Sequence, residues 1–138
     1  MLLDQSISDF FKADYEHIVA AYLYGSAASG SAGEAGDVDI GLLFDGNAMD
    51  LVTGCVEDIL VKLPRVLRRD IHPVVMNTAG EELLRQIFSK GRCVVVKDEN
   101  QLAYFKMTAF ARIANYSYYR QIFQRGVIRR VSAGGSVG

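Results

Sequence analysis

The sequence predicts a mixed α/β (α+β) fold, with a small mixed β-sheet flanked by helices and followed by a long C-terminal helix. Apolar runs of strand length alternate with segments whose apolar residues recur at helical spacing. Half of the 138 residues are hydrophobic, which is enough for a core, and the length suits one domain. No repeat or shift in composition is visible. We therefore expect a single domain over residues 1–130 and a flexible tail over 131–138.

Four short apolar runs predict the strands of the sheet. These predicted strands are 17–24, 38–44, 70–76 and 93–96. Asp45-Gly46-Asn47 is a turn signal after the second run. Pro73 indicates that the third run is an edge strand or a strand end, because proline cannot donate to a neighbouring strand.

Helical spacing between these runs predicts the helices. The predicted helices are 4–15, 48–63, 81–88 and 99–124. The first places Ile7, Phe10 and Phe11 on one side. We expect Pro64 to close the second helix and Gly91 to follow the third. The apolar positions of the second helix are Leu51, Val52, Val56, Ile59, Leu60 and Leu63.

The C-terminal helix carries two apolar stripes, whereas a surface helix normally needs one. The first stripe is Leu102, Phe105, Ala109, Ile113, Tyr116 and Phe123, and the second is Ala103, Met107, Phe110, Ala114, Tyr118 and Ile122. Tyr116, Tyr118, Tyr119 and Arg120 match the composition of interface anchors. We therefore expect another chain to cover the second stripe. The alternative is a helix sunk deep in its own domain.

Composition narrows the class of protein. The net charge is −1 with both signs spread along the chain, so a strongly basic nucleic-acid footprint is absent. No apolar run approaches the roughly 18 to 20 residues of a membrane helix, and the N-terminus lacks the basic region of a signal peptide. Cys55 and Cys93 lack metal-site spacing and predict reduced thiols. We expect a cytoplasmic protein with no direct contact to nucleic acid or membrane.

A Gly-Ser turn and two aspartates are the most informative feature of the chain. Gly25-Ser26 ends the first strand, and Asp37-Val38-Asp39 opens the second after a spacer of ten residues, 27–36. Alternation along a strand puts both aspartates on one face, which suits Mg²⁺ completed by water and substrate phosphate. The turn exposes backbone N–H groups at an expected helix start, where the dipole favours phosphate. Together they predict a nucleotidyl-transfer site.

This pattern resembles the nucleotidyltransferase superfamily related to DNA polymerase beta, whose signature is Gly-Ser, a spacer and Asp-x-Asp. The short chain and ten-residue spacer look most like the minimal nucleotidyltransferases called MNT proteins, over about residues 15–98 and more loosely the C-terminal helix. Their best understood members are antitoxins encoded beside HEPN-domain toxins. The resemblance implies the polymerase beta-like fold. It also implies Mg²⁺, ATP as substrate, and AMP transfer to a tyrosine of a partner HEPN ribonuclease.

The resemblance also implies a role for each motif residue. Asp37 and Asp39 would bind the metal, and Gly25 and Ser26 would hold the ATP phosphates. In the family a third carboxylate on a neighbouring strand completes the metal site and can take the proton from the attacking hydroxyl. Asp70 matches that place.

Each of these residues also has a structural interpretation. The two paired aspartates can be a polar strand start, and Ser26 can belong to a simple strand-to-helix turn. Asp70 can pair with Arg68 or Arg69 or cap the strand. His72 shares the face of Asp70, where it either touches the nucleotide or acceptor or serves as a surface residue. Gly30 and Gly33 are expected to shape the loop.

The sequence departs from the family pattern in two places. Segment 27–36 contains no Lys or Arg, and Gly36 replaces the usual Ser before the first aspartate. Arg68, Arg69, Lys106 and Arg112 are the candidate suppliers of positive charge for the triphosphate.

Two other functions remain open. One is a small-molecule, antibiotic-modifying adenylyltransferase that uses the same residues. The other is a catalytically weak antitoxin that acts by binding.

Overall fold

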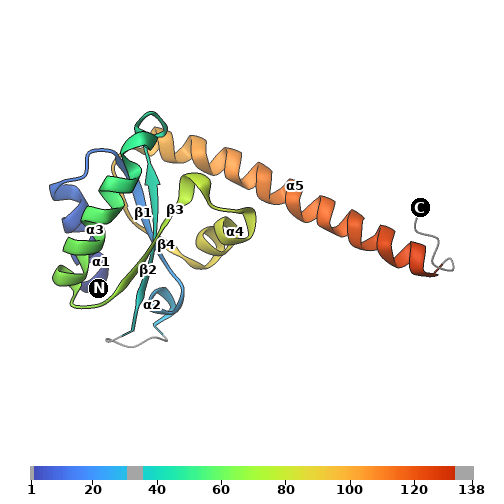
Figure 1. The fold of residues 1–138 in the computed structure, drawn as a ribbon, viewed down its shortest axis with the longest axis horizontal. Helices are drawn as coiled ribbons and strands as arrows, with labels where there is room; N and C mark the ends of the chain where they lie inside the picture. Colours follow the sequence, from blue (N-terminus) through green and yellow to red (C-terminus); the bar gives the residue numbers. More distant parts are fainter. Residues whose placement is uncertain (1, 31–35, 133–138) are drawn as a thin grey trace.

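A computed structural model describes residues 2–30 and 36–132 and shows a four-stranded sheet with helices on both faces (Figure 1). The strands are β1 (Ile18–Tyr24), β2 (Val38–Phe44), β3 (Ile71–Val75) and β4 (Arg92–Val96). Their order is β3-β2-β1-β4. Strand β1 is antiparallel to both β2 and β4, whereas β2 and β3 are parallel. The predicted mixed sheet is confirmed.

Helices cover the two faces of the sheet in pairs. The helices are α1 (Leu2–Ala13), α2 (Ser26–Ser29), α3 (Val52–Leu67), α4 (Glu81–Lys90) and α5 (Glu99–Ser132), with short 3₁₀ helices η1 (Gly46–Leu51) and η2 (Met76–Thr78). Helices α1 and α3 lie on one face, whereas α4 and the beginning of α5 lie on the other (Figure 1). No helix in this part of the chain is both long and apolar enough to cross a membrane.

Two apolar clusters, one on each face, hold the layers together. Phe11 of α1 and Ile59 of α3 are fully buried against one side of the sheet. Ile87 of α4 and Leu102 of α5 are buried against the other side. Every residue of β1 is buried, because β1 is an inner strand covered on both faces. Strand β3 is an edge strand, as Pro73 predicted.

The predicted end of the second long helix is wrong. Helix α3 continues through Pro64 to Leu67, although a proline removes an N–H donor and crowds the preceding turn. Leu63 is fully buried and Leu67 packs on the same cluster, so burial stabilises the last turn. Arg68, with φ of 55°, ends the helix in the left-handed conformation.

Other boundaries also differ from the prediction. The first helix lies about two residues earlier than expected, and the region 46–51 is 3₁₀ rather than α-helical. Leu51 and Leu60 are exposed rather than in the core. Helix α5 passes Gly126 and ends eight residues later than predicted, because a single glycine is tolerated in a helix. Residues 133–138 of the expected tail lie outside the described residues.

Candidate active site

The candidate site lies at the end of the sheet where β1 finishes and β2 begins. Tyr24, the last residue of β1, is paired with Asp39 of β2. Gly25 follows with φ of 74° and ψ of −156°, a combination that is essentially restricted to glycine. A Cβ on Gly25 would collide with the carboxylate of Asp39. The structure thus packs the Gly-Ser turn directly against an aspartate of the second motif.

Helix α2 shows that part of the predicted loop is helical. It begins at Ser26, as the expected helix start requires, and the Ser29 N–H donates to the Gly25 carbonyl at 3.3 Å. Gly30 ends it with φ of 79°, and its N–H donates to the Ser26 carbonyl. Glycine is the residue that adopts this conformation at least cost, so the shaping role expected for Gly30 is supported. Gly33 lies outside the described residues.

Asp37 and Asp39 flank a buried valine, as strand alternation predicted. Val38 is fully buried on the α1 and α3 side, whereas Asp37 is exposed and Asp39 is half-buried. Asp37 lies one residue before β2 begins. Its Oδ2 lies 2.9 Å from Nε2 of His72 on the neighbouring strand. His72, left open by the sequence, is therefore a direct partner of the first motif aspartate.

The pKa of His72 is raised by the surrounding carboxylates. The hydrogen bond to Asp37 raises the pKa of His72 above its usual 6.5, and the charges of Asp37, Asp39 and Asp70 raise this pKa further. In this hydrogen bond the Nε2–H of His72 donates to the Asp37 carboxylate, and a positive charge on the imidazole strengthens the bond. The three predicted carboxylates thus act on one imidazole at one end of the sheet.

Asp70 precedes β3 rather than opening it. Its carbonyl accepts a hydrogen bond from the Val38 N–H at 2.9 Å, which ties the starts of the two parallel strands together. Within residues 2–30 and 36–132, no group of three or more His, Cys, Asp or Glu side chains is arranged to hold a metal ion. The metal-binding roles of Asp37, Asp39 and Asp70 stay predictions, as do the phosphate roles of Gly25 and Ser26.

The suggested cations lie in different parts of the molecule. Arg69 borders the site, and its Nε donates to the Gly36 carbonyl at 2.8 Å. Arg112 pairs with Glu81 of α4 at 2.9 Å, and Nζ of Lys106 lies 6.0 Å from the centre of the Tyr22 ring. The structure thus brings Arg69 to the carbonyl that precedes the motif aspartates, whereas Arg112 is engaged with α4.

Sequence reasoning missed Arg92, the first residue of β4. Its Nη1 donates to the Ala28 carbonyl of α2 at 2.7 Å. Its Nε and Nη2 donate to the two carboxylate oxygens of Asp4 at 2.7 and 2.9 Å. These hydrogen bonds fix α2 to α1 and β4. Because α2 begins at Ser26, Arg92 thereby helps to position the Gly-Ser turn. An arginine directly after the turn residue Gly91 was the available signal.

Tyr24 was also missed. It is buried, and burial raises the pKa of its hydroxyl, with the nearby charge of Asp39 raising this pKa further. The phenol therefore stays neutral beside the carboxylate at physiological pH.

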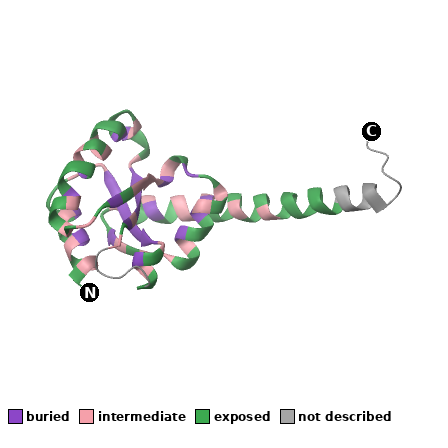
Figure 2. Ribbon diagram, turned by 60° about the horizontal axis from the view of Figure 1, so that its bottom comes forward, coloured by how far each residue is buried: buried purple, intermediate pink, exposed green. Residues whose placement is uncertain are grey.

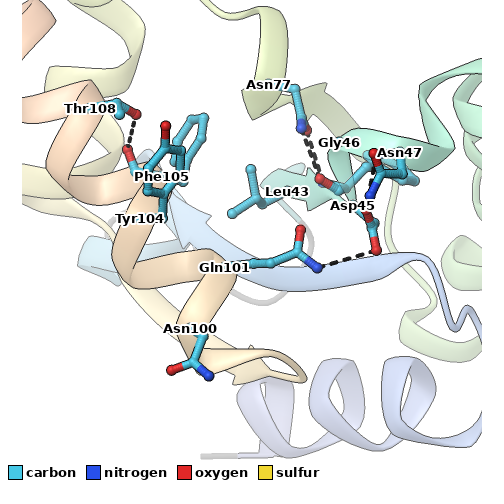
Figure 3. A pocket seen from close by; sticks show the side chains of 11 residues that line it. Leu43, Asp45, Gly46, Asn47, Asn77, Asn100, Gln101, Tyr104, Phe105 and Thr108 are labelled. Atoms are coloured by element: carbon cyan, nitrogen blue, oxygen red, sulfur yellow. Dashed lines mark hydrogen bonds between the residues drawn. The ribbon is translucent and has the colours of Figure 1, made fainter.

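A well-formed cavity lies at the other end of the sheet and is separate from this site. It has a volume of about 450 Å³ and is lined by residues at the end of β2, in the segment that follows it and at the beginning of α5, including Leu43, Asn47 and Tyr104 (Figure 3). Its polar groups are mainly engaged with one another. Gln101 donates to Asp45 at 3.2 Å, and Asn77 bonds the backbone of Phe44. The cavity therefore does not contribute to the chemistry of the aspartates.

A family comparison identifies the class of protein that this fold and site define. A model of the polymerase beta nucleotidyltransferase family matches residues 5–100. The match covers more than half of the chain, so the chain belongs to this nucleotidyltransferase family. No curated protein matches the chain in sequence.

Solved structures agree with the family. One is a toxin–antitoxin crystal structure with AMP-PNP, with 20% identity, a TM-score of 0.63, and coverage of 94% of this chain and 98% of the other. A second is the tri-AMPylated Shewanella oneidensis HEPN toxin in complex with MNT antitoxin, with 19% identity, a TM-score of 0.62, and coverage of 92% and 97%. A third is the toxin–antitoxin MntA-HepT, with 18% identity, a TM-score of 0.62, and the same coverage. These likenesses confirm the polymerase beta-like fold.

Proposed function

We propose that this chain is an antitoxin that transfers AMP from ATP to a tyrosine hydroxyl of a partner HEPN ribonuclease, and so neutralises it in the cytoplasm. The family supplies the nucleotidyltransferase class. Among the similar structures are a toxin–antitoxin pair with AMP-PNP and a tri-AMPylated toxin with its antitoxin. The observation that carries the proposal is the contact of Gly25 with the Asp39 carboxylate, which joins the proposed phosphate turn to the proposed metal ligand.

The proposed reaction forms one bond and breaks one. The acceptor tyrosine oxygen attacks the α-phosphorus of ATP, and the bond from this phosphorus to the bridging oxygen of the β-phosphate breaks. Pyrophosphate leaves, and Asp70 takes the tyrosine proton. Ser26 and the backbone of Gly25 hold the phosphates, while Arg92 keeps α2 in place. In such transfers the protein mainly positions the groups and stabilises charge.

The residues present fit Mg²⁺ as partial ligands. Carboxylate oxygens are the ligands that this cation prefers, and it commonly takes one or two of them together with water and substrate phosphate. Asp37, Asp39 and Asp70 supply such oxygens on adjoining strand starts, which explains why no complete protein cage is needed. When bound, the cation neutralises the developing charge on the phosphate oxygens.

Mass spectrometry tests the proposed reaction. The chain is incubated with ATP, Mg²⁺ and the HEPN protein encoded beside it, and the HEPN protein should gain mass in multiples of one AMP. The double variant Asp37→Asn/Asp39→Asn should lower this rate by about a hundredfold or more, since charge stabilisation of several kcal/mol is lost. Asp50→Asn, which changes an exposed aspartate of η1, is the matched control and should react normally. No mass gain with the unmodified chain would reject the enzymatic proposal.

A second candidate is neutralisation by binding alone. The absence of Lys and Arg from segment 27–36 favours it, because the triphosphate then receives less positive charge. The same double variant separates the two functions. If Asp37→Asn/Asp39→Asn still protects cells from the toxin as well as the unmodified chain does, binding rather than AMP transfer is the activity.

A further inference from the structure

The outer half of α5 projects away from the sheet and carries apolar side chains into solvent. Leu102 and Ala109 are buried and Ile113 packs partly on the sheet side, but beyond residue 113 the helix is mostly exposed (Figure 2). Tyr116 and Phe123 continue the same stripe with 40% and 72% of their surface exposed. The alternative that α5 is sunk deep in its own domain is therefore wrong for this outer half, whereas the expectation that another chain covers the second stripe stays a prediction. The stripe that anchors α5 continues past the body of the protein.

This continuation forms one wall of a groove. Arg112, Tyr116, Tyr119, Arg120 and Phe123 recur at spacings of three and four residues, so they share one side of α5, here called the groove face. Glu81 of α4 closes the other side of the groove, whose volume is about 530 Å³. A groove with aromatic rings and arginines along one wall has the composition of an interface core.

The groove face already attracts carboxylates within the molecule. Arg112 pairs with Glu81 at 2.9 Å, and Arg120 pairs with Glu82 at 3.1 Å. The Arg120 guanidinium also lies 5.7 Å from the centre of the Tyr116 ring, which holds it along the groove. Helix α4 thus shows what chemistry this face accepts. Acidic side chains lie beside its aromatic rings.

The charge of α5 indicates which kind of molecule binds to the groove face. The part of the helix whose side chains the structure describes, residues 99–125, contains four basic residues and one acidic residue: Lys106, Arg112, Arg120, Arg125 and Glu99. A second copy of the chain would bring arginines against arginines, which is repulsive. Nucleic acid suits arginine and aromatic rings, but a chain with a net charge of −1 lacks the strongly basic footprint that nucleic acid binding requires. A protein with an acidic surface and apolar side chains complements the groove face best.

We infer that the groove face of α5 docks an acidic, amphipathic helix of a partner protein. This inference rests on the proposed function for the identity of the partner, which is the HEPN protein. It adds that docking occurs on α5, whereas the motif aspartates lie at the beginning of β2 and before β3. Binding and AMP transfer should therefore be separable by substitution.

A matched pair of double variants tests this surface. Phe123→Ser/Arg120→Glu removes an apolar side chain and reverses a charge on the groove face. Val61→Ser/Arg65→Glu makes the same kinds of change at exposed positions of α3, which packs on the other face of the sheet. Affinity for the full-length HEPN protein is measured by calorimetry at two salt concentrations. The groove-face variant should weaken binding at least tenfold, whereas the control should bind within about threefold of the unmodified chain. Binding should weaken as salt rises.

The outcomes distinguish this inference from the proposed reaction. If the groove-face variant binds the HEPN protein as tightly as the control does, or if the unmodified chain does not bind it, the docking surface is wrong. This holds whether or not AMP is transferred. If binding depends on the groove face but no AMP is transferred, the docking surface stands and the proposed reaction fails.

Self-association and RNA binding are checked with the same variants. Sedimentation of the chain alone should be unchanged by Phe123→Ser/Arg120→Glu. A dimer that this variant dissociates would assign the face to a second copy and overturn the inference, as would binding of a single-stranded RNA 20-mer that the variant abolishes. Circular dichroism checks folding, and Phe123→Ser alone replaces the double variant if that variant is unfolded.

Discussion

At the scale of single residues, the site depends on a glycine that packs against a carboxylate. Gly25 and Gly30 bound the short helix α2, and both have positive φ values. They differ in their surroundings. A Cβ on Gly25 would meet the Asp39 carboxylate, whereas a Cβ on Gly30 would meet nothing within 4 Å. Substitutions at the two positions therefore distinguish two effects. Both introduce backbone strain, but only a side chain at Gly25 also collides with the Asp39 carboxylate.

Gly25→Ala should disrupt the site more than Gly30→Ala does. The Gly25 conformation costs a residue with a side chain about 1–3 kcal/mol, and the collision displaces Asp39 as well. Gly30→Ala should cost only about 1 kcal/mol and leave ATP binding nearly normal. Chemical denaturation and ATP titration measure the two effects. Equal losses of ATP affinity in both variants would contradict the packing of Gly25 against Asp39.

His72 should titrate at a higher pH than an ordinary histidine. Its folded pKa is raised, first by the hydrogen bond to Asp37, so its contribution to stability is fully present below the unfolded pKa near 6.5. That contribution is lost as pH rises through the raised pKa. NMR titration of the imidazole should show this, and Asp37→Asn should lower the His72 pKa. An unchanged pKa in this variant would show that the 2.9 Å contact does not form in solution.

At the scale of elements, Arg92 connects three segments that are far apart in the sequence. It lies at the start of β4, bonds a carbonyl of α2 and forks onto Asp4 of α1. Helix α2 has only four residues and would not persist by itself. Its position therefore depends on contacts with neighbouring elements. Arg92 supplies strong contacts, because its charged guanidinium donates one hydrogen bond to the Ala28 carbonyl and two to the Asp4 carboxylate.

Arg92→Gln should loosen α2 and lower stability by about 1–2 kcal/mol, a value discounted because the pair is partly exposed. ATP affinity should fall as well, because the Gly-Ser turn is no longer fixed. Arg85→Gln is the matched control, since Arg85 forms an exposed ion pair with Glu82, which lies one helical turn before it in α4. It should change stability by less than about 0.5 kcal/mol. Thermal unfolding and ATP titration compare them.

At the scale of the whole molecule, a three-layer body carries the site and a projecting helix carries the groove face. Among residues 99–125 of α5, whose burial the structure describes, Ala109 is the last buried residue and Ile113 is the last apolar side chain that packs partly on the core. Asp37, Asp39, Asp70 and His72 lie at one end of the sheet, whereas the five side chains of the groove face lie on α5. From this division we expect the proposed catalysis and the inferred docking to respond independently to substitution.

A chain ending at residue 114 should fold with a melting temperature within a few degrees of the full chain. It keeps Leu102, Ala109 and Ile113 and loses only the exposed outer helix. A chain ending at residue 100 should unfold or lose several kcal/mol, since Leu102 and Ala109 leave the core. Calorimetry compares them. Strong destabilisation of the longer truncation would show that the outer helix contributes to the fold.

The sequence predicted the mixed sheet, the place of all four strands and the family, because these depend on local periodicity and on a spaced motif. It placed the Gly-Ser turn at a helix start and Pro73 on an edge strand. It was wrong where burial overrides local preference. Pro64 lies inside α3 because Leu63 and Leu67 are held by the core. It also missed Arg92, whose partners Asp4 and Ala28 are 88 and 64 residues away in the chain.

The spaced motif, through its resemblance to the polymerase beta superfamily, indicated a nucleotidyltransferase, and strand alternation predicted that Asp37 and Asp39 flank a buried Val38, since strand geometry alone orients alternate side chains. Only the tertiary structure decided that His72 contacts Asp37, that Gly25 packs on Asp39, and that α5 leaves the body beyond Ile113. These are contacts between segments that strand pairing and packing bring together. No local pattern encodes them, because each depends on where a distant segment ends in space.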